Sequence, residues 1–408
     1  MRSIILTVRT IASLTGLAML PAASPAFGQS QAVAVTEISF DLIGVYEDNI
    51  PRSSDLLAQQ RGLEQEDFTL SPTLSLNIVR LIGTTEVEVR GQVGYVFHAN
   101  NSELDRERIG LNARAEVPLG PCRIEPEAGL QRRQSDLRDI VFLPAVGANA
   151  IENTETVQRY GVSLACGRNP GLQPYAGITY EKAENSSVLR ERAEYESTTY
   201  RGGVRYSSAA LGEVSLYGSR KSTSLSPLAF AAGGDTSYNF DEVGAEIKRE
   251  IGSRVQATAS VGYGRIDSDN IFINSFKGLT WNLELTALIG ANLRVTAGTG
   301  REVGNSLASD AGFVVSTPHR VRLEYAFSER ARFDLGGGIT KRRFGYDVVP
   351  GPFAITDETL RRVDGGLSYD LGRRFNVRLF AGHERRSANG TLFDYSASFA
   401  GASIGLRF

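Results

Sequence analysis

Long segments in which apolar and polar side chains alternate recur along most of the chain, as at 68–78, 87–97, 255–263 and 279–287. In 255–263 the odd positions hold valine, alanine or tyrosine, and the even positions hold glutamine, threonine, serine or glycine. A period of two is that of a β-strand with one apolar face. The segments reach about ten residues or more, whereas strands of globular proteins average about 5–6. A tilted strand of about ten residues can cross a bilayer, so the pattern predicts an all-β chain of membrane-crossing strands.

Tight turns separate these segments at intervals of roughly 40 residues. A propeller repeat has a similar period, but each of its blades holds four short strands. Two long strands and one longer loop per repeat instead predict the hairpins of an outer-membrane barrel. The turns are Ile82-Gly83, Leu119-Gly120, Cys166-Gly167, Leu211-Gly212, Ile251-Gly252, Ile289-Gly290 and Leu371-Gly372, with Ser328-Glu329-Arg330 in the remaining position.

We therefore predict an all-β, transmembrane, antiparallel outer-membrane β-barrel of about 18 strands, with 16 as the alternative, and with both termini in the periplasm. Pro126 would interrupt the hydrogen bonding of its strand, and a slip in the alternation near Asp241 predicts a bulge. Strands are expected near 36–48, 67–79, 85–98, 106–117, 123–133, 155–166, 173–183, 198–207, 213–221, 237–250, 254–266, 277–288, 292–302, 318–328, 331–343, 360–370, 374–386 and 393–408.

The N-terminal residues have the pattern of a secretory leader. Two arginines precede an apolar run at 11–19, and small residues surround the end of the segment at Gly28. This predicts a cleaved signal peptide at 1–28, a short periplasmic segment at 29–35 and a single barrel domain at 36–408.

The C-terminus ends on Phe408, with Leu406 and Ile404 at the two preceding alternate positions. This ending resembles the C-terminal assembly signal of bacterial outer-membrane barrels. A terminal strand that pairs with the first strand would also leave no open sheet edge. The chain is therefore expected to meet the barrel-assembly machinery.

Composition and motifs exclude several other classes. After the leader no run approaches the roughly 18 apolar residues of a spanning helix, and a net charge of −2 does not suggest nucleic-acid binding. The three histidines, His98, His319 and His383, are far apart in the sequence and no nucleophile motif surrounds them. We expect no enzyme activity, no cofactor and no metal site.

A barrel of this size is too wide for side chains to fill, so its inward-facing residues should line an aqueous or plugged lumen. Arginines dominate the late strands and glutamates the early ones. Two such walls would create a transverse field that favours anionic or polar solutes near the arginines. The alternative is that the charges pair locally and only keep the lumen wet. The expected arginine wall is Arg294, Arg320, Arg322, Arg332, Arg342, Arg362, Arg374 and Arg378; the acidic wall is Glu86, Glu88, Glu116, Glu125, Glu127 and Glu181.

Cys122 and Cys166, the only cysteines, are predicted to form a disulfide. Antiparallel partners share a constant sum of residue numbers, and this pair centres its hairpin on Pro144, inside the loop at 134–153. The periplasm is oxidising, although two free thiols remain the alternative.

Apolar residues around proline in three long loops predict a gate. Exposed large apolar side chains forgo about 1.5–3 kcal/mol each relative to burial, so these segments should find cover in the lumen, against each other or at a partner subunit. The alternative is that they extend the strands above the membrane. The gate residues are Phe142, Leu143, Pro144, Phe230 and Phe353.

By its length, strand rhythm and closing segment at 402–408, the chain resembles the beta-barrel porin 2 family of outer-membrane proteins of Gram-negative bacteria. The resemblance implies an outer-membrane channel, either for polar or anionic solutes or as a conduit in exopolysaccharide export. Its expected partners are outer-membrane lipid, lipopolysaccharide and periplasmic polysaccharide-export components. The alternative is a barrel without a channel, which acts through its surface loops as an adhesin, a structural anchor or a surface enzyme. A secreted sugar-binding propeller is a third possibility.

Overall fold

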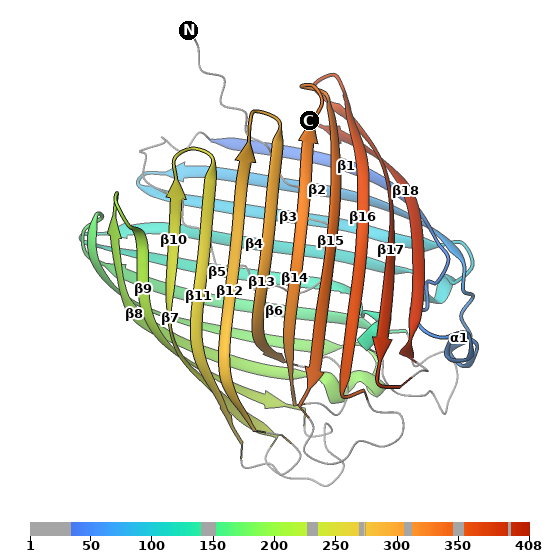
Figure 1. Cartoon of the computed structure of the whole chain (residues 1–408), viewed down its shortest axis with the longest axis horizontal. Coiled ribbons are helices and arrows are strands. Elements are labelled where there is room, and N and C mark those ends of the chain that lie inside the picture. The colour runs from blue at the N-terminus through green and yellow to red at the C-terminus, as the bar shows by residue number, and fades with distance from the viewer. Residues whose placement is uncertain are drawn as a thin grey trace.

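The computed structural model describes residues 34–139, 152–226, 236–268, 273, 275–305, 312–345, 355–390 and 393–408. These residues form one sheet of 18 antiparallel strands, in which each strand pairs with its neighbours in the chain. β1 (Val35–Glu47) also pairs with β18 (Tyr395–Arg407), so the sheet closes into a barrel (Figure 1). Closure gives every strand a partner on both sides.

The other strands are β2 (Asp67–Ile82), β3 (Thr85–His98), β4 (Arg106–Leu119), β5 (Cys122–Gln134), β6 (Thr154–Cys166), β7 (Gly171–Asn185), β8 (Tyr195–Ser208), β9 (Gly212–Leu225), β10 (Ser237–Ile251), β11 (Val255–Asp267), β12 (Phe276–Ile289), β13 (Leu293–Asn305), β14 (Phe313–Ala326), β15 (Ala331–Phe344), β16 (Asp357–Leu371) and β17 (Phe375–Ala388). The described helices are α1 (Asp55–Arg61) and the short 3-10 helices η1 (Ser102–Leu104), η2 (Leu137–Asp139) and η4 (Val188–Ala193). None of these helices is long and apolar enough to cross a membrane.

Each predicted strand corresponds to one strand of the barrel, which confirms the number 18. The bulge expected near Asp241 is wrong, because β10 stays in continuous register with β9 and β11 through that residue. Asp241 instead faces outward and bonds Arg220 of β9 at 2.6 Å, which explains the break in the apolar pattern. Pro126 does interrupt the ladder between β4 and β5, whose pairing is missing between Glu127 and Ile124.

The two faces of the wall differ as the alternation predicts. Exposed apolar side chains such as Leu283 and Leu379 cover the outer face. Aromatic side chains accompany them toward both ends, for example Tyr263 and Phe333, as in the girdles of membrane barrels. The outer surface therefore suits a hydrocarbon environment.

The two ends of the barrel also differ. Short turns join the strands at one end, and at Gly83 and Gly290 these turns adopt φ values of 64° and 65°, which glycine reaches without a Cβ clash. We call this the turn end; the C-terminus lies there (Figure 1). The opposite end, which carries α1 and the longer connections, is called the loop end.

Loop 1, the connection at 48–66, contains α1. The Ser54 hydroxyl accepts a hydrogen bond from the Leu57 N–H at 3.4 Å, and Gly62 ends the helix with φ 71°. Ser54 is an ordinary N-cap and Gly62 an ordinary C-cap, and together they fix both ends of the helix within the loop.

This helix packs across the barrel mouth. Leu57 is fully buried against Phe344 at the end of β15, Ile355 and Phe393. Loop 1 therefore contacts strands well beyond its own hairpin. A second apolar cluster lies inside the loop end along β6 to β14, formed by Val157, Ala183, Tyr195, Leu225, Tyr238, Ile266, Ile273, Phe276 and Phe313.

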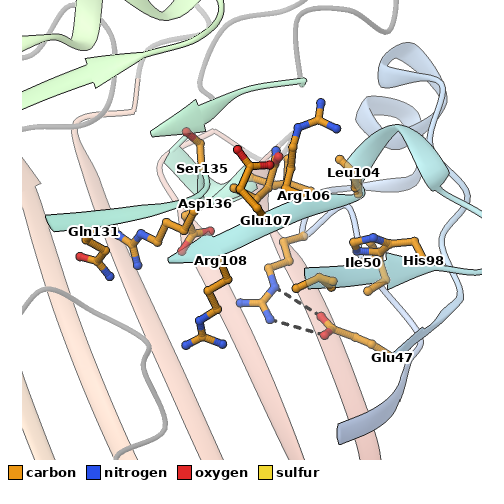
Figure 2. Close-up of a pocket in the computed structure, with 15 residues that line it drawn as sticks. Glu47, Ile50, His98, Leu104, Arg106, Glu107, Arg108, Gln131, Ser135 and Asp136 are labelled. Carbon is orange, nitrogen blue, oxygen red and sulfur yellow. Dashed lines mark hydrogen bonds and ion pairs between the residues drawn. The ribbon is translucent and has the colours of Figure 1, made fainter. Parts of the chain in front are cut away.

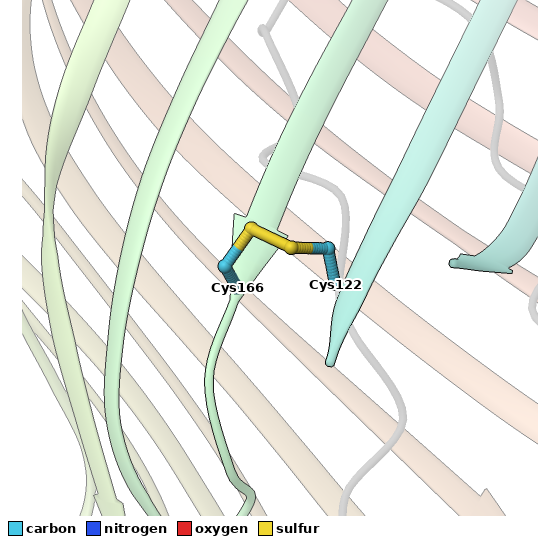
Figure 3. The surroundings of a disulfide bond; sticks show 2 residues. All are labelled: Cys122 and Cys166. Carbon is cyan, nitrogen blue, oxygen red and sulfur yellow. A yellow bond between two sulfur atoms is a disulfide. The ribbon is translucent and has the colours of Figure 1, made fainter. Parts of the chain in front are cut away.

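The structure joins Cys122 and Cys166 in a disulfide at the turn end (Figure 3). The two residues are direct register partners on β5 and β6, as the constant sum of residue numbers predicts. The bond links residues 44 positions apart.

Replacing both cysteines with serine is expected to lower the free energy of unfolding by about 2–4 kcal/mol, because the unfolded chain regains the entropy of the open loop. Urea unfolding of the detergent-solubilised protein, with and without reductant, measures the change. Reductant should weaken the native protein and leave the double variant unchanged; equal stability of the two proteins would show that the cross-link contributes nothing.

Candidate functional site at the inner wall and the loop end

The predicted arginine wall is largely present, but it is not a wall of free positive charge. Arg322 lies 2.7 Å from Asp334 and 3.0 Å from Asp364. Arg378 also binds Asp334, at 2.9 Å, and Arg362 binds Asp364 at 3.3 Å. Arginines and aspartates of β14, β15, β16 and β17 therefore alternate in one continuous network.

The remaining predicted arginines differ in their surroundings. Arg332 pairs with Asp370 at 2.7 Å, and Arg342 pairs with Glu358. Arg294 and Arg320 have no ion pair with another described residue. Arg374 was placed on the lumen wall wrongly: it lies exposed in the turn between β16 and β17, because β17 begins only at Phe375.

The predicted acidic wall is paired as well. Glu88 contacts Arg90 and Arg114, and Glu127 lies 3.3 Å from Arg159. Arg123 bridges Glu116 at 2.7 Å and Glu125 at 3.1 Å, while Glu181 accepts a hydrogen bond from Tyr195 at 2.8 Å. Glu86 of β3 lies opposite Glu116 in the register. Local pairing, the alternative to a transverse field, therefore describes most of both walls.

Glu384 of β17 is the centre of the network at the loop end. Its carboxylate lies 3.3 Å from Arg52 of loop 1, 3.5 Å from Arg138 and 3.6 Å from Arg362, and it accepts a hydrogen bond from the Tyr395 hydroxyl. The side chain is only 3% exposed. A buried carboxylate is tolerated when several donors satisfy it, and here two of those donors belong to loops.

Arg52, which contacts Glu384, has an unusual backbone conformation. Its φ is 50°, a left-handed conformation that is uncommon for a residue with a side chain. Asn49 supports the turn, donating from Nδ2 to the Ser53 carbonyl at 3.1 Å and to the Ser396 carbonyl at 3.3 Å. Arg52 also contacts Glu47 at 3.3 Å, so charges on the wall stabilise the turn.

Loop 3 is the connection at 135–153 after β5, and the structure describes its residues 135–139 and 152–153. Arg138 binds Asp136 within the loop and reaches Glu384 across the opening. Arg386 of β17 donates to the Arg138 carbonyl at 3.0 Å. Segments almost 250 positions apart in the sequence are thus in contact.

Loops 1 and 3 also contact each other. The Arg61 guanidinium, on the last residue of α1, donates to the Pro51 carbonyl at 3.2 Å and to the Leu137 carbonyl at 3.4 Å. Leu137 packs with Leu63 and Leu104. The described parts of the two loops therefore form one body that is attached to the wall.

Electrostatics favour this closed arrangement. Burial alone would raise the pKa of the Asp136 carboxyl, but the charge and hydrogen bonds of Arg138, together with the charge of Arg52, hold that pKa well below its usual range. The carboxylate therefore stays ionised at neutral and mildly acidic pH. Burial, then the charges of Arg386 and Arg190, lowers the pKa of Arg61 to about 10, which keeps the guanidinium protonated at neutral pH.

A cavity of about 280 Å³ lies beneath the two loops on the inner wall (Figure 2). Four arginines line it: Arg52, Arg106, Arg108 and Arg133. Figure 2 shows Arg108 and Arg106 on one strand, beside Asp136 of loop 3 and opposite Glu47. A solute that entered past the loops would meet this cavity early.

The sequence did not identify loop 1 or Glu358 as parts of the site. The capping residues of α1 could have predicted the helix, but no local pattern indicates where it docks. The predicted gate residues Phe142, Leu143, Pro144, Phe230 and Phe353 lie outside the described residues, so the gate they would form stays a prediction.

The histidines do not gather at one place. His98 contacts Asp105 at 3.1 Å, His319 contacts the Thr299 hydroxyl at 2.8 Å, and His383 contacts the Ser398 hydroxyl at 3.0 Å. Within the described ranges no group of three or more histidine, cysteine, aspartate or glutamate side chains has the geometry of a metal site.

No family model and no curated protein matches the chain. Among solved structures, Pseudomonas aeruginosa OccK2 (OpdF) is 13% identical, with a TM-score of 0.48 over 92% of this chain and 97% of that one. The outer membrane protein opdK from Pseudomonas aeruginosa is 14% identical, with a TM-score of 0.45 over 92% and 99%. A mutant of the ferric enterobactin receptor (PfeA) from the same organism is 10% identical, with a TM-score of 0.47 over 92% and 81%. These similarities are too weak to assign a function, and membership of the beta-barrel porin 2 family stays a prediction.

Proposed function

We propose that this chain is a porin-like channel of the Gram-negative outer membrane that passes polar or anionic solutes. The observation that carries the proposal is a closed 18-stranded barrel with an apolar outer face and a charged inner wall. Barrels of 16–18 strands are generally too wide for side chains to fill and leave an aqueous path. Charged side chains on the inner face keep such a path wet.

The charge pattern supports polar and anionic permeants over apolar ones. Paired charges along the wall provide hydrogen-bonding groups without a strong net field, whereas the cavity at the loop end is rich in arginine. Positive potential at an entrance raises the local concentration of anions.

Location and partners follow as parts of the same proposal. The apolar outer face would contact outer-membrane lipid and lipopolysaccharide, and the turn end with both termini would face the periplasm. Residues 1–28 would direct secretion and be cleaved, and the barrel-assembly machinery would recognise the C-terminal strand.

Two further functions remain proposals: a more specific role as a channel, and a role that needs no channel. The barrel could serve as a conduit in exopolysaccharide export together with periplasmic export components. Alternatively, it could act without a channel, as an adhesin, a structural anchor or a surface enzyme. The contacts of loop 1 with the wall and with the described part of loop 3 would suit either a gate or a closed scaffold.

Planar-bilayer recording of the purified protein tests the proposed channel. We expect discrete conductance steps, and a reversal potential in a potassium chloride gradient that shows a modest preference for chloride. Heat-denatured protein is the control. Silent bilayers with a protein that still shifts its mobility on an SDS gel after boiling would contradict the channel and favour a non-channel barrel.

A further inference from the structure

Two arginines face each other on the inner wall of the cavity beneath loops 1 and 3. The register of β4 and β5 pairs Ile109 with Arg132, so Arg108 lies directly opposite Arg133. Both line the cavity and both are half-buried. Like charges directly opposite on neighbouring strands are destabilising, and nothing in the barrel geometry requires arginine at both positions.

The carboxylates around the cavity are already engaged. Glu47 pairs with Arg52, Asp136 with Arg138, and Glu107 with Arg132. Glu155, on the strand next to Arg133, lies 3.7 Å from it. Arg106 has a contact of 3.6 Å with Glu152.

Arg108 differs from these arginines. Within the part of the chain that the structure describes, it has no ion pair and no side-chain hydrogen bond. Its direct partner across the β3–β4 pairing is Gly94, which offers no side chain to the guanidinium. One uncompensated positive charge therefore points into a cavity.

We propose that Arg108 and Arg133 form a binding site for the carboxylate or phosphate group of a small anionic solute. The inference deepens the proposed channel function and rests on it, because the site would be the first binding position of a permeant anion beneath the loops. A guanidinium offers two parallel N–H donors that match the oxygens of such a group. Two guanidiniums across one strand pair can share an oxyanion, which replaces their repulsion with attraction.

The surroundings set the class of solute. A cavity of about 280 Å³ is near the lower end of the range for small-molecule sites. Gln131 and Ser135, which also line the cavity, offer neutral hydrogen-bonding groups beside the arginines. The site therefore fits a short, polar organic anion better than a polymer chain.

Titration calorimetry of the full-length mature protein in detergent tests the site. The probes are succinate and inorganic phosphate, and succinamide is the neutral isostere of succinate. We expect heat of binding with both anions, weakened by added salt, and none with succinamide. No binding of either anion, or equal binding of succinamide, would overturn the proposal.

Two variants separate binding from structure. Arg108→Gln should weaken binding of succinate and phosphate roughly ten- to a hundredfold, the usual effect of losing charged hydrogen bonds. Because it also removes a repulsive pair, it should unfold at an equal or higher urea concentration than the parent. A structural arginine would show the opposite, with lower stability and unchanged binding.

The matched control is Arg220→Gln, which changes an arginine on the outer face of β9, where it bonds Asp241 at 2.6 Å and does not line the cavity. Binding should be unchanged in this variant.

The experiments also distinguish a failure of the site from a failure of the channel. If Arg108→Gln conducts ions but binds anions as the parent does, the proposed site is wrong and the proposed channel stands. If the parent binds anions but never conducts, the site stands and the channel is wrong.

Discussion

Replacing Glu384 with glutamine is expected to release loops 1 and 3 from the wall and to increase the single-channel conductance. Glutamine keeps the shape of the side chain but removes the charge that Arg52, Arg138 and Arg362 share. Removing one partner of a buried ion pair typically costs about 3–5 kcal/mol. If that cost falls on loop closure, the closed-to-open ratio drops by roughly a hundredfold or more.

Conductance and limited proteolysis of loop 1 measure this effect together, because released loops should be cut faster. The control is Asp357→Asn, which disrupts an exposed pair with Arg343 on the outer face of the same end; exposed pairs contribute at most about 1 kcal/mol.

A double variant with Arg138→Gln should cost less than the sum of the single changes, since the two side chains interact directly. A conductance of Glu384→Gln equal to that of the parent, in a protein that still folds, would show that these loops do not limit passage.

Deleting Phe408 is expected to abolish most assembly of the barrel in the outer membrane while changing the finished fold little. In the structure Phe408 is 70% exposed, and its backbone N–H donates to the Ile38 carbonyl at 2.9 Å. Loss of that hydrogen bond costs only about 0.5–1.5 kcal/mol. A large loss of assembled protein would therefore report recognition of the C-terminal residue during assembly.

The yield of heat-modifiable protein in outer-membrane fractions measures the effect. Phe375→Ala is the matched control, because Phe375 is also an exposed aromatic at the turn end and pairs with Leu406. We expect normal yield for this control. Equal yields of the deletion and the parent would show that Ile404, Leu406 and Phe408 are not an assembly signal, although β18 would still close the barrel.

Sequence patterns predicted the strands well where each strand crosses the apolar band. The differences lie at the loop end: β14 begins at Phe313 rather than near 318, and β9 continues to Leu225 rather than ending near 221. In these extensions apolar side chains also lie on the inner face. The alternation of apolar outward and polar inward residues, from which the strands were predicted, is therefore lost there. Phe313 and Leu225, for example, belong to the buried cluster inside the mouth.

The amino-acid sequence alone determined the number of strands, their facing and the pairing of Cys122 with Cys166. Each of these depends on neighbours along one strand or within one hairpin. In a strand whose two faces meet different environments, alternate side chains face each environment, so the sequence alternates in polarity. The tertiary structure alone decided which charges pair and where the loops dock. Closure of the barrel brings Arg138 to Glu384, 246 positions away in the sequence, and contacts across a lumen leave no periodic trace in the chain.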